Sequence, residues 1–179
     1  MNSEKELISR CLDKDPKAQE QLYRRFAPKM YGVCLRYARS KMEAEDILQE
    51  GFIKVFNHLS DYRYEGVFEG WIRRTFVNTA INYYKQKSKE WAEISLDKAE
   101  ANHSIDHDVI EKLSVQELME IIQQLPEGYR IIFNLYVIEG YTHQEIGNIL
   151  NISENTSKSQ LSRARIALQH KIKQRKSNR

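Results

Sequence analysis

The chain has 179 residues, of which 41% are hydrophobic and 30% charged, and its 28 basic residues nearly balance 25 acidic ones. This composition supports a packed core and excludes wholesale disorder, and no apolar run approaches the roughly 18 residues that cross a bilayer. Apolar residues recur at spacings of three and four, and Gly and Pro are few, which predicts an all-helical protein. The two cysteines, Cys11 and Cys34, are too few for a disulfide framework, and we expect buried thiols in a reducing compartment.

Charge is distributed unevenly along the chain. Residues 1–87 carry 16 bases and 12 acids, residues 88–125 carry 3 and 9, and residues 126–179 carry 9 and 4. Two basic segments around an acidic one predict separate modules that face a polyanion. We therefore expect two small helical domains, at residues 1–87 and 110–172. A flexible acidic linker is expected at 88–109 and a basic tail at 173–179.

The segment "AEDILQEGFIKVFNHL" has two different helical faces. One face is apolar and is expected in the core: Leu48, Phe52, Val55, Phe56 and Leu59. The opposite face holds Asp46, Gln49, Glu50, Ile53 and Asn57. An isoleucine among acids is typical of a partner surface with an apolar centre and a charged rim. A solvated face with one incidental isoleucine is the alternative.

The next segment, "FEGWIRRTFVNTAINYYKQK", contains no acid from Trp71 onward. Its expected core side is formed by Ile72, Phe76, Ala80 and Tyr83. The side that carries Trp71 holds bases and amides, namely Arg74, Asn78, Asn82 and Lys85. Such a face suits single-stranded DNA, because aromatic rings stack on bases and cations follow the backbone. The alternative for Trp71 is a ring wedged between helices.

Residues 88–108 are polar, acidic and poorly periodic, which is typical of a linker. His103 and His107 lie there beside two aspartates, but nothing nearby supports a ligand set, so we expect no metal or cofactor. Helical periodicity resumes from Leu113 to Leu125. Pro126 is expected to separate this helix from the next one, "YRIIFNLYVIEG", which should end at Gly140.

A helix-turn-helix is predicted after Gly140. Thr142 and Glu145 form the pattern of a capping box at the first helix start, where His143 is expected on the surface. Asn151 tolerates the left-handed conformation that turns the chain, and Ser153 can cap the second helix. Two helices joined by about four residues, the second rich in bases, are typical of this motif.

The second helix has a narrow packing stripe formed by Leu161, Ala164 and Leu168. The opposite side and its flanks carry side chains that suit the major groove: Thr156, Lys158, Ser159, Gln160, Arg163 and Arg165. Residues 155–179 contain eight bases and no acid. A carboxylate would repel phosphate there, so this exclusion predicts docking on a nucleic acid, with a solvated basic tail as the alternative beyond Lys171.

The segment "LPEGYRIIFNLYVIEGYTHQEIGNILNISENTSKSQLSRARIAL" resembles the domain of sigma-70 family factors that binds the −35 promoter element. The pieces "EGYTHQEIG" and "TSKSQLSRAR" carry the resemblance. Ser157 stands where the family usually has an apolar residue, which predicts weaker packing at the helix start. Gln160 stands where an arginine is frequent, so the family's base preference does not transfer.

The first half resembles the same family. "AEDILQEGFIKVF" is similar to its core-polymerase-binding segment, which implies that Asp46, Gln49 and Glu50 contact the clamp coiled coil of the β′ subunit. The helix at 68–87 resembles the −10 reading region, with Trp71, Asn78 and Lys85 at matching positions and Asn82 in place of a frequent aspartate. The loop "DYRYEGVFEG" corresponds to the family's base-capturing loop, which implies roles for Tyr64, Glu65 and Phe68.

Two such regions with a short linker are similar to the extracytoplasmic-function group of the family. The resemblance implies a dissociable, non-catalytic promoter-specificity subunit in the cytoplasm. Its implied partners are core RNA polymerase (the β′ clamp and the β flap), promoter DNA and an anti-sigma factor. A stand-alone helix-turn-helix regulator is the alternative. An enzyme is disfavoured, since the sequence has no Gly-rich phosphate loop and no nucleophile–base pairing.

Overall fold

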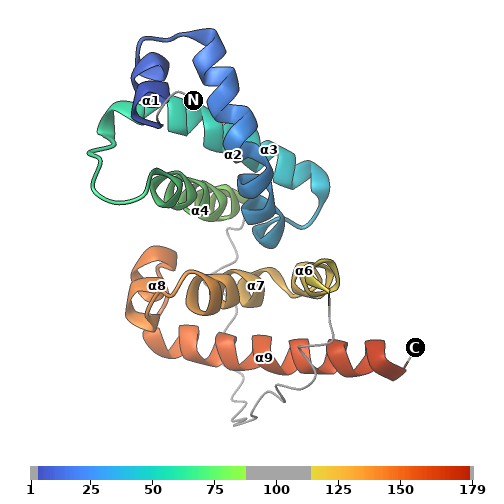
Figure 1. Cartoon of the computed structure of the whole chain (residues 1–179). Helices are drawn as coiled ribbons and strands as arrows, with labels where there is room; N and C mark the ends of the chain where they lie inside the picture. The colour runs from blue at the N-terminus through green and yellow to red at the C-terminus, as the bar shows by residue number, and fades with distance from the viewer. Residues whose placement is uncertain (1–3, 88–113, 178–179) are drawn as a thin grey trace. The chain divides into compact units, whose positions relative to one another are not determined.

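The computed structural model describes residues 4–87 and 114–177, in which every regular element is helical, as predicted (Figure 1). They belong to two compact units that divide between Tyr83 and Tyr84, near the end of α4. The predicted linker at 88–109 lies outside the described residues. Within the described ranges, no helix has the length and apolar character needed to span a membrane.

The first unit contains α1 (Glu4–Leu12), α2 (Pro16–Tyr37), α3 (Lys41–Asn57), a short 3-10 helix (Leu59–Asp61) and most of α4 (Phe68–Lys87), up to Tyr83. Asp15 starts α2, because its carboxylate accepts hydrogen bonds from the backbone N–H groups of Lys17 and Ala18. Arg10 pairs with the same carboxylate at 2.6 Å and holds the pKa of Asp15 below its usual range. The corner between α1 and α2 is therefore closed by polar contacts.

Aromatic rings join α3 to α4 in the core of the first unit. The rings of Phe52 and Phe76 meet edge to face at 5.1 Å. Gly51 makes this approach possible, since a Cβ atom at that position would lie 2.2 Å from Cε1 of Phe76. The predicted core face of α3 is confirmed, with only Phe56 partly exposed. On α4 the prediction for Tyr83 is wrong: the neighbouring Tyr84 is buried instead.

Both cysteines of the first unit are free thiols and are buried, as predicted. Burial raises the pKa of Cys34 to about 12 and also raises the pKa of Cys11. A thiol that stays protonated is a poor nucleophile and a poor metal ligand. These side chains therefore act as small core residues.

The second unit contains α6 (Val115–Gln123), α7 (Glu127–Phe133), a π-helical segment η2 (Asn134–Ile138), α8 (His143–Leu150) and α9 (Glu154–Ser177). The predicted single helix from Tyr129 to Gly140 is wrong, because it changes from α to π geometry at Asn134. The buried Asn134 side chain donates to the Arg130 carbonyl at 2.9 Å. Gly140 has a φ of +78° and follows the end of the segment, as predicted.

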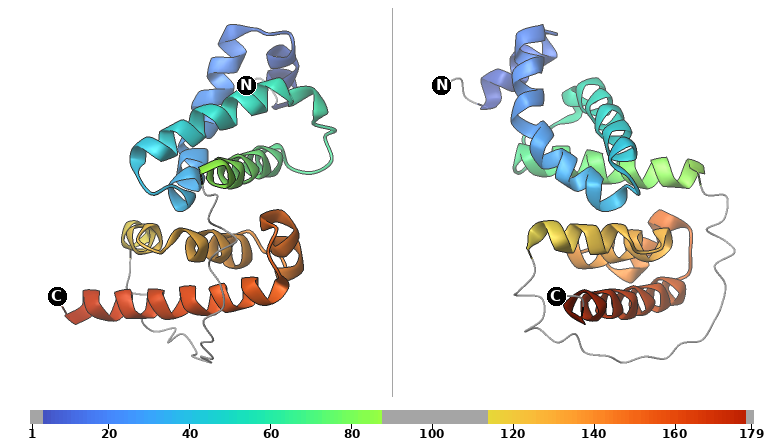
Figure 2. Two further views of the ribbon diagram at one scale, coloured as in Figure 1. Left: turned by 180° about the vertical axis from the view of Figure 1, so that it is seen from behind. Right: turned by 90° about the vertical axis from the view of Figure 1, so that its right-hand side faces the viewer.

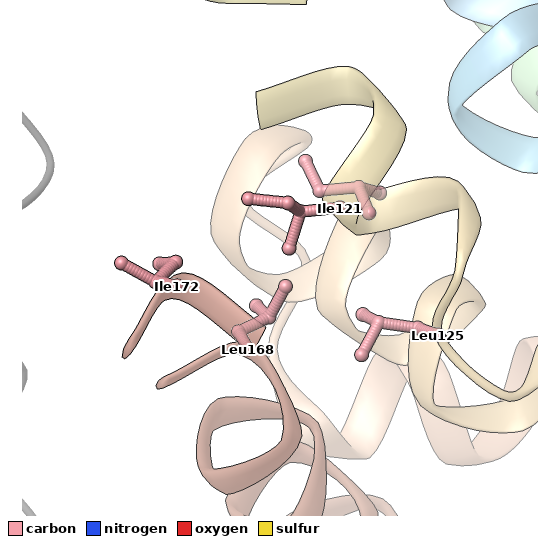
Figure 3. Close-up of a cluster of buried hydrophobic side chains, with 5 residues drawn as sticks. Ile121, Leu125, Leu168 and Ile172 are labelled. Atoms are coloured by element: carbon pink, nitrogen blue, oxygen red, sulfur yellow. The ribbon is translucent and has the colours of Figure 1, made fainter. Parts of the chain in front are cut away.

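Helices α6, α7 and α8 lie on one side of α9 (Figures 1 and 2). An apolar cluster joins α6 to the C-terminal half of α9 and contains Ile121, Ile122, Leu125, Leu168 and Ile172 (Figure 3). Beyond it, Lys171 donates to the Gln124 side chain at 3.2 Å and Arg175 pairs with Glu120. The apolar stripe of α9 continues to Ile172, and the helix itself runs on to Ser177, into the segment expected to be a basic tail.

Candidate nucleic-acid interface

The helix-turn-helix has the predicted caps and turn. The Thr142 side chain accepts from the Glu145 backbone N–H, and the Glu145 carboxylate accepts in return from the Thr142 N–H at 2.8 Å. Asn151 adopts the left-handed conformation, with φ 57° and ψ 46°. Ser153 then caps α9 by accepting from the Thr156 N–H at 3.0 Å. These local contacts fix the angle at which α9 leaves the turn.

His143 and Ser157 contact each other across the motif. Nδ1 of His143 lies 2.9 Å from Oγ of Ser157, which is fully buried, and the imidazole stacks on Tyr136 at 4.3 Å. His143 lies at the surface with its ring partly covered. Ser157 does not leave a packing defect, because its hydroxyl is satisfied by the histidine. The first turns of α8 and α9 are joined by this pair.

Acid is expected to destabilise the second unit through His143. Burial, followed by the positive charge of Lys158, lowers the pKa of His143 below its ordinary value of 6.5. The folded unit therefore binds this proton less readily than the unfolded chain, so this contribution to stability is fully present above pH 6.5. It is lost as the pH falls through the lower, folded pKa.

Urea unfolding at pH 7.5 and 5.5 measures this effect, with the chain carrying His143→Gln as the comparison. We expect the wild type to lose stability between these pH values and the variant to lose less. The carboxylates of Glu145 and Glu154 have lowered pKa values, so their titration falls below this window. An equal loss in both proteins would contradict the assignment.

The side chains predicted to face DNA on α9 differ in their exposure. Lys158 and Ser159 are exposed, while Thr156, Arg163 and Arg165 are half-buried. Gln160 is only 3% exposed, which contradicts its predicted place on the DNA face. Gln160 lies about 40° from Ala164, at the edge of the Leu161–Ala164–Leu168 stripe, and both α7 and α8 pack against α9.

The basic side chains on α9 also differ in whether an acidic residue of the chain pairs with them. Lys158 pairs with Glu154 one turn earlier at 2.6 Å, which partly neutralises it. Arg163 and Arg165 make no ion pair within the described residues of the chain. Their guanidinium groups are therefore free to donate to an external acceptor.

The face of α3 predicted to contact a protein is exposed in the structure. Asp46 and Gln49 are exposed, Ile53 is 59% exposed, and Glu50 pairs with Lys54 at 2.6 Å. Met42 is 70% exposed one turn before Asp46. Sequence analysis missed Met42, although a spacing of four residues places it on the same helical face as Asp46.

The basic and amide face of α4 is also exposed as predicted, at Arg74, Asn78, Asn82 and Lys85. Trp71 is half-buried, and its ring lies nearly parallel to that of Phe68 at 5.8 Å. Phe68 is 0% exposed and also meets Phe26 edge to face at 5.6 Å. Its burial contradicts the prediction that it captures a DNA strand. Phe68 instead packs against the Trp71 ring from the core.

The loop before α4 presents a different ring. Tyr64 is 47% exposed and adopts a φ of 59°, and Gly66 follows with a φ of 97°. The Tyr62 hydroxyl closes the loop by donating to the Gly66 carbonyl at 2.8 Å. Tyr64 is thus held outward on a defined turn, next to the exposed Glu65. An outward ring of this kind can stack on a planar ligand.

Metal ligands do not gather anywhere in the two described ranges, where no three His, Cys, Asp or Glu side chains are grouped. His103 and His107, which we expected to be solvated, lie outside these ranges. The described surfaces therefore offer charge, amides and rings as their chemistry.

Comparison with known proteins identifies the family. Residues 22–90 match the family described as Sigma-70 region 2, and residues 115–168 match Sigma-70, region 4. The RNA polymerase sigma-H factor of Pseudomonas aeruginosa is 27% identical over 176 residues, which cover 92% of this chain and 91% of the relative. The ECF RNA polymerase sigma-E factor of Escherichia coli strain K12 is 29% identical over 177 residues, which cover 93% and 92%.

Among solved structures, the fold is similar to that of the sigma factor RpoE from Bartonella quintana, determined in complex with the anti-sigma factor NepR. The identity is 18% and the TM-score 0.52, with 86% of this chain and 96% of that chain covered. Both matched regions of the sigma-70 family occur here in order, in a chain that aligns along nearly its whole length with such factors. The chain therefore belongs to the sigma-70 family of RNA polymerase sigma factors, in its extracytoplasmic-function group.

Proposed function

We propose that this protein is a dissociable subunit that gives core RNA polymerase its promoter specificity. It would bind polymerase through α3, read the −35 element through α9, and capture the melted −10 strand through α4 and the preceding loop. One observation supports the proposal above all: the chain matches both sigma-70 regions, and the helices in those regions expose faces that suit polymerase and DNA. No catalytic group is required, because binding energy alone can open a few base pairs.

The exposed face of α3 favours a protein partner. The carboxylates of Asp46 and Glu50 lie between the exposed apolar side chains of Met42 and Ile53, so a complementary surface would offer both basic and apolar groups. The clamp coiled coil of the β′ subunit is the proposed occupant, with the β flap proposed as a contact of the second unit. An anti-sigma factor is the proposed inhibitor. Since polymerase works on the chromosome, the proposed site of action is the cytoplasm.

Residues 1–87 and 110–172 are proposed as the two functional domains, tethered by residues 88–109. The side chains proposed to contact the −35 duplex are Thr156, Lys158, Ser159, Arg163 and Arg165. Those proposed for the −10 strand are Tyr64, Trp71, Arg74, Asn78, Asn82 and Lys85. Because the basic side chains among them would contact phosphates, we expect the affinity for promoter DNA to fall steeply as the salt concentration rises.

Replacing Arg163 with alanine is expected to weaken −35 recognition by about 1–3 kcal/mol, because one bidentate donor to a base edge is lost. Arg163 makes no ion pair within the described residues, so its removal should leave the fold unchanged. Holoenzyme binding to −35 sequences, compared with Lys173→Ala at an exposed site farther along α9, is the measurement. A −35 footprint that persists unaltered would remove Arg163 from the site.

Replacing Trp71 with alanine is expected to impair promoter opening more than initial duplex binding. The half-buried ring stands at the start of the exposed face of α4, where it can stack on an unpaired base. Such a contact is worth about 1–3 kcal/mol and exists only after melting. Permanganate reactivity of the bubble reports opening, and gel shift at low temperature reports duplex binding. Equal losses in both assays would argue against strand capture.

Run-off transcription over a genomic library, with purified core polymerase, tests the proposed function directly. We expect new start sites that appear only when the chain is added. A stand-alone helix-turn-helix regulator would instead bind duplex DNA without polymerase and would create no start sites. A chain that neither joins polymerase nor redirects initiation would overturn the proposal.

A further inference from the structure

Helix α1 precedes the matched region, which begins at residue 22, yet it contributes to the loop that presents Tyr64. The Nζ atom of Lys5 lies 5.8 Å from the centroid of the Tyr64 ring. This distance is within the range of a cation–π contact, and both side chains are exposed. The ammonium group and the outward ring therefore form one surface feature.

The bases of the first unit differ in whether carboxylates neutralise them. Ion pairs engage many of them with acids on the same or a neighbouring helix: Arg10, Arg24, Arg25, Lys29, Arg39 and Lys54. Lys5 and Arg63 make no ion pair within the described residues, and neither do Arg74 and Lys85 on the exposed face of α4. Uncompensated cations are the ones that can release counterions by binding phosphate.

Aromatic rings connect these two pairs of free cations. The ring of Tyr64 lies 4.9 Å from that of the buried Tyr62, which in turn lies 5.7 Å from Trp71. The buried Tyr62 ring is therefore in contact with two partly exposed rings, those of Tyr64 and Trp71. Lys5 lies beside the Tyr64 ring, and Arg74 follows Trp71 by one helical turn on α4.

Bases can stack on the exposed rings of Tyr64 and Trp71, and cations without ion pairs lie beside both. Such a surface suits a single polynucleotide strand. An acidic protein would be served by the cations alone and would leave the outward Tyr64 ring and the amides of α4 without a role. The row of rings thus favours single-stranded DNA as the occupant.

We propose that Lys5 on α1 and Arg63 in the loop before α4 extend the strand-binding site of α4 past Tyr64, and that both contact phosphates of the unpaired promoter strand. The proposal rests on the proposed function, since the strand becomes unpaired only in a polymerase complex. It assigns α1 a part in promoter opening.

The test uses holoenzyme assembled from core polymerase and the full chain, together with fork DNA whose −10 non-template strand is single-stranded. The DNA sequence comes from a promoter at which the wild type initiates. Affinity is measured against salt concentration for Lys5→Gln, Arg63→Gln and Lys5→Arg. The control is Lys41→Gln, which removes an exposed, unpaired lysine at the opposite end of α3 from the loop.

Each glutamine variant is expected to make the slope of log affinity against log salt shallower by about 0.7, with roughly a threefold loss of affinity at moderate salt. Lys5→Arg should keep the wild-type slope, and Lys41→Gln should match the wild type. An unchanged slope in both variants, or an equal change in the control, would overturn this inference alone. A loss of affinity at constant slope would also overturn it, since Lys5 would then only support Tyr64.

The failure of the proposed function would look different. Wild-type chain that does not bind polymerase, or that directs no initiation, would overturn both proposals before the variants are compared. Circular dichroism on each variant confirms that the exposed substitutions leave the helices intact.

Discussion

Charge reversal at Asp46 and Glu50, with lysine at both positions, is expected to abolish binding to core polymerase while the chain stays folded. Both carboxylates lie on the exposed face of α3 around Ile53, and neither belongs to the core. Loss of one buried interfacial charge pair costs about 2–5 kcal/mol, and reversal adds repulsion. Two reversals should therefore lower the affinity by roughly a thousandfold or more. Fluorescence anisotropy of labelled chain with core polymerase measures this directly.

The matched control is Glu20→Lys on α2, which removes an exposed glutamate that pairs only with Arg24 one turn away. It should bind polymerase like the wild type. Glu50→Lys also faces Lys54 on the same helix, which costs a few tenths of a kcal/mol of helix stability and not the fold. Unchanged polymerase affinity in the folded double variant would reject α3 as the docking surface.

Phe68→Ala is expected to destabilise the first unit by about 3–5 kcal/mol, because it removes a fully buried ring and leaves a cavity. The ring contacts Phe26, Tyr62 and Trp71, so neighbouring side chains cannot close the space without moving the start of α4. For a domain of this size, about 4–8 °C is lost per kcal/mol. Thermal unfolding by circular dichroism should therefore show a fall of tens of degrees.

Tyr64→Ala is the informative comparison, because both residues are sequence-based candidates for strand capture. The exposed ring of Tyr64 should cost little stability when removed, and its loss should appear in promoter opening instead. If Phe68→Ala were as stable as the wild type and defective only in opening, the structural role of Phe68 would be refuted.

Helical periodicity predicted much of the fold because it depends only on neighbours along the chain. The buried face of α3 and the cap at Thr142 follow from spacings of three and four residues. Sequence reasoning failed where burial depends on a second helix. Gln160 lies about 40° from Ala164 at the edge of the apolar stripe, and on a helix packed against both α7 and α8 it is buried. Phe68 belongs by sequence to a loop, but its ring is enclosed by residues from α2 and α4.

Two further features could not be read from spacing at all. His143 and Ser157 are fourteen positions apart, and only the folded turn brings them to 2.9 Å. Similarly, Arg175 reads as part of a basic tail until the structure places Glu120 beside it. In both cases a polar side chain pairs with a residue far away in the sequence, and only the tertiary structure brings the two together.

The contact between Gly51 and Phe76 has a consequence for assembly. A Cβ atom at position 51 would overlap the Phe76 ring, so α3 and α4 are in close contact at this point. The proposed polymerase-binding face of α3 and the proposed strand-binding face of α4 are thus joined through the core of one folded unit. If both proposals hold, the position at which α3 binds the polymerase would set the position at which α4 holds the strand.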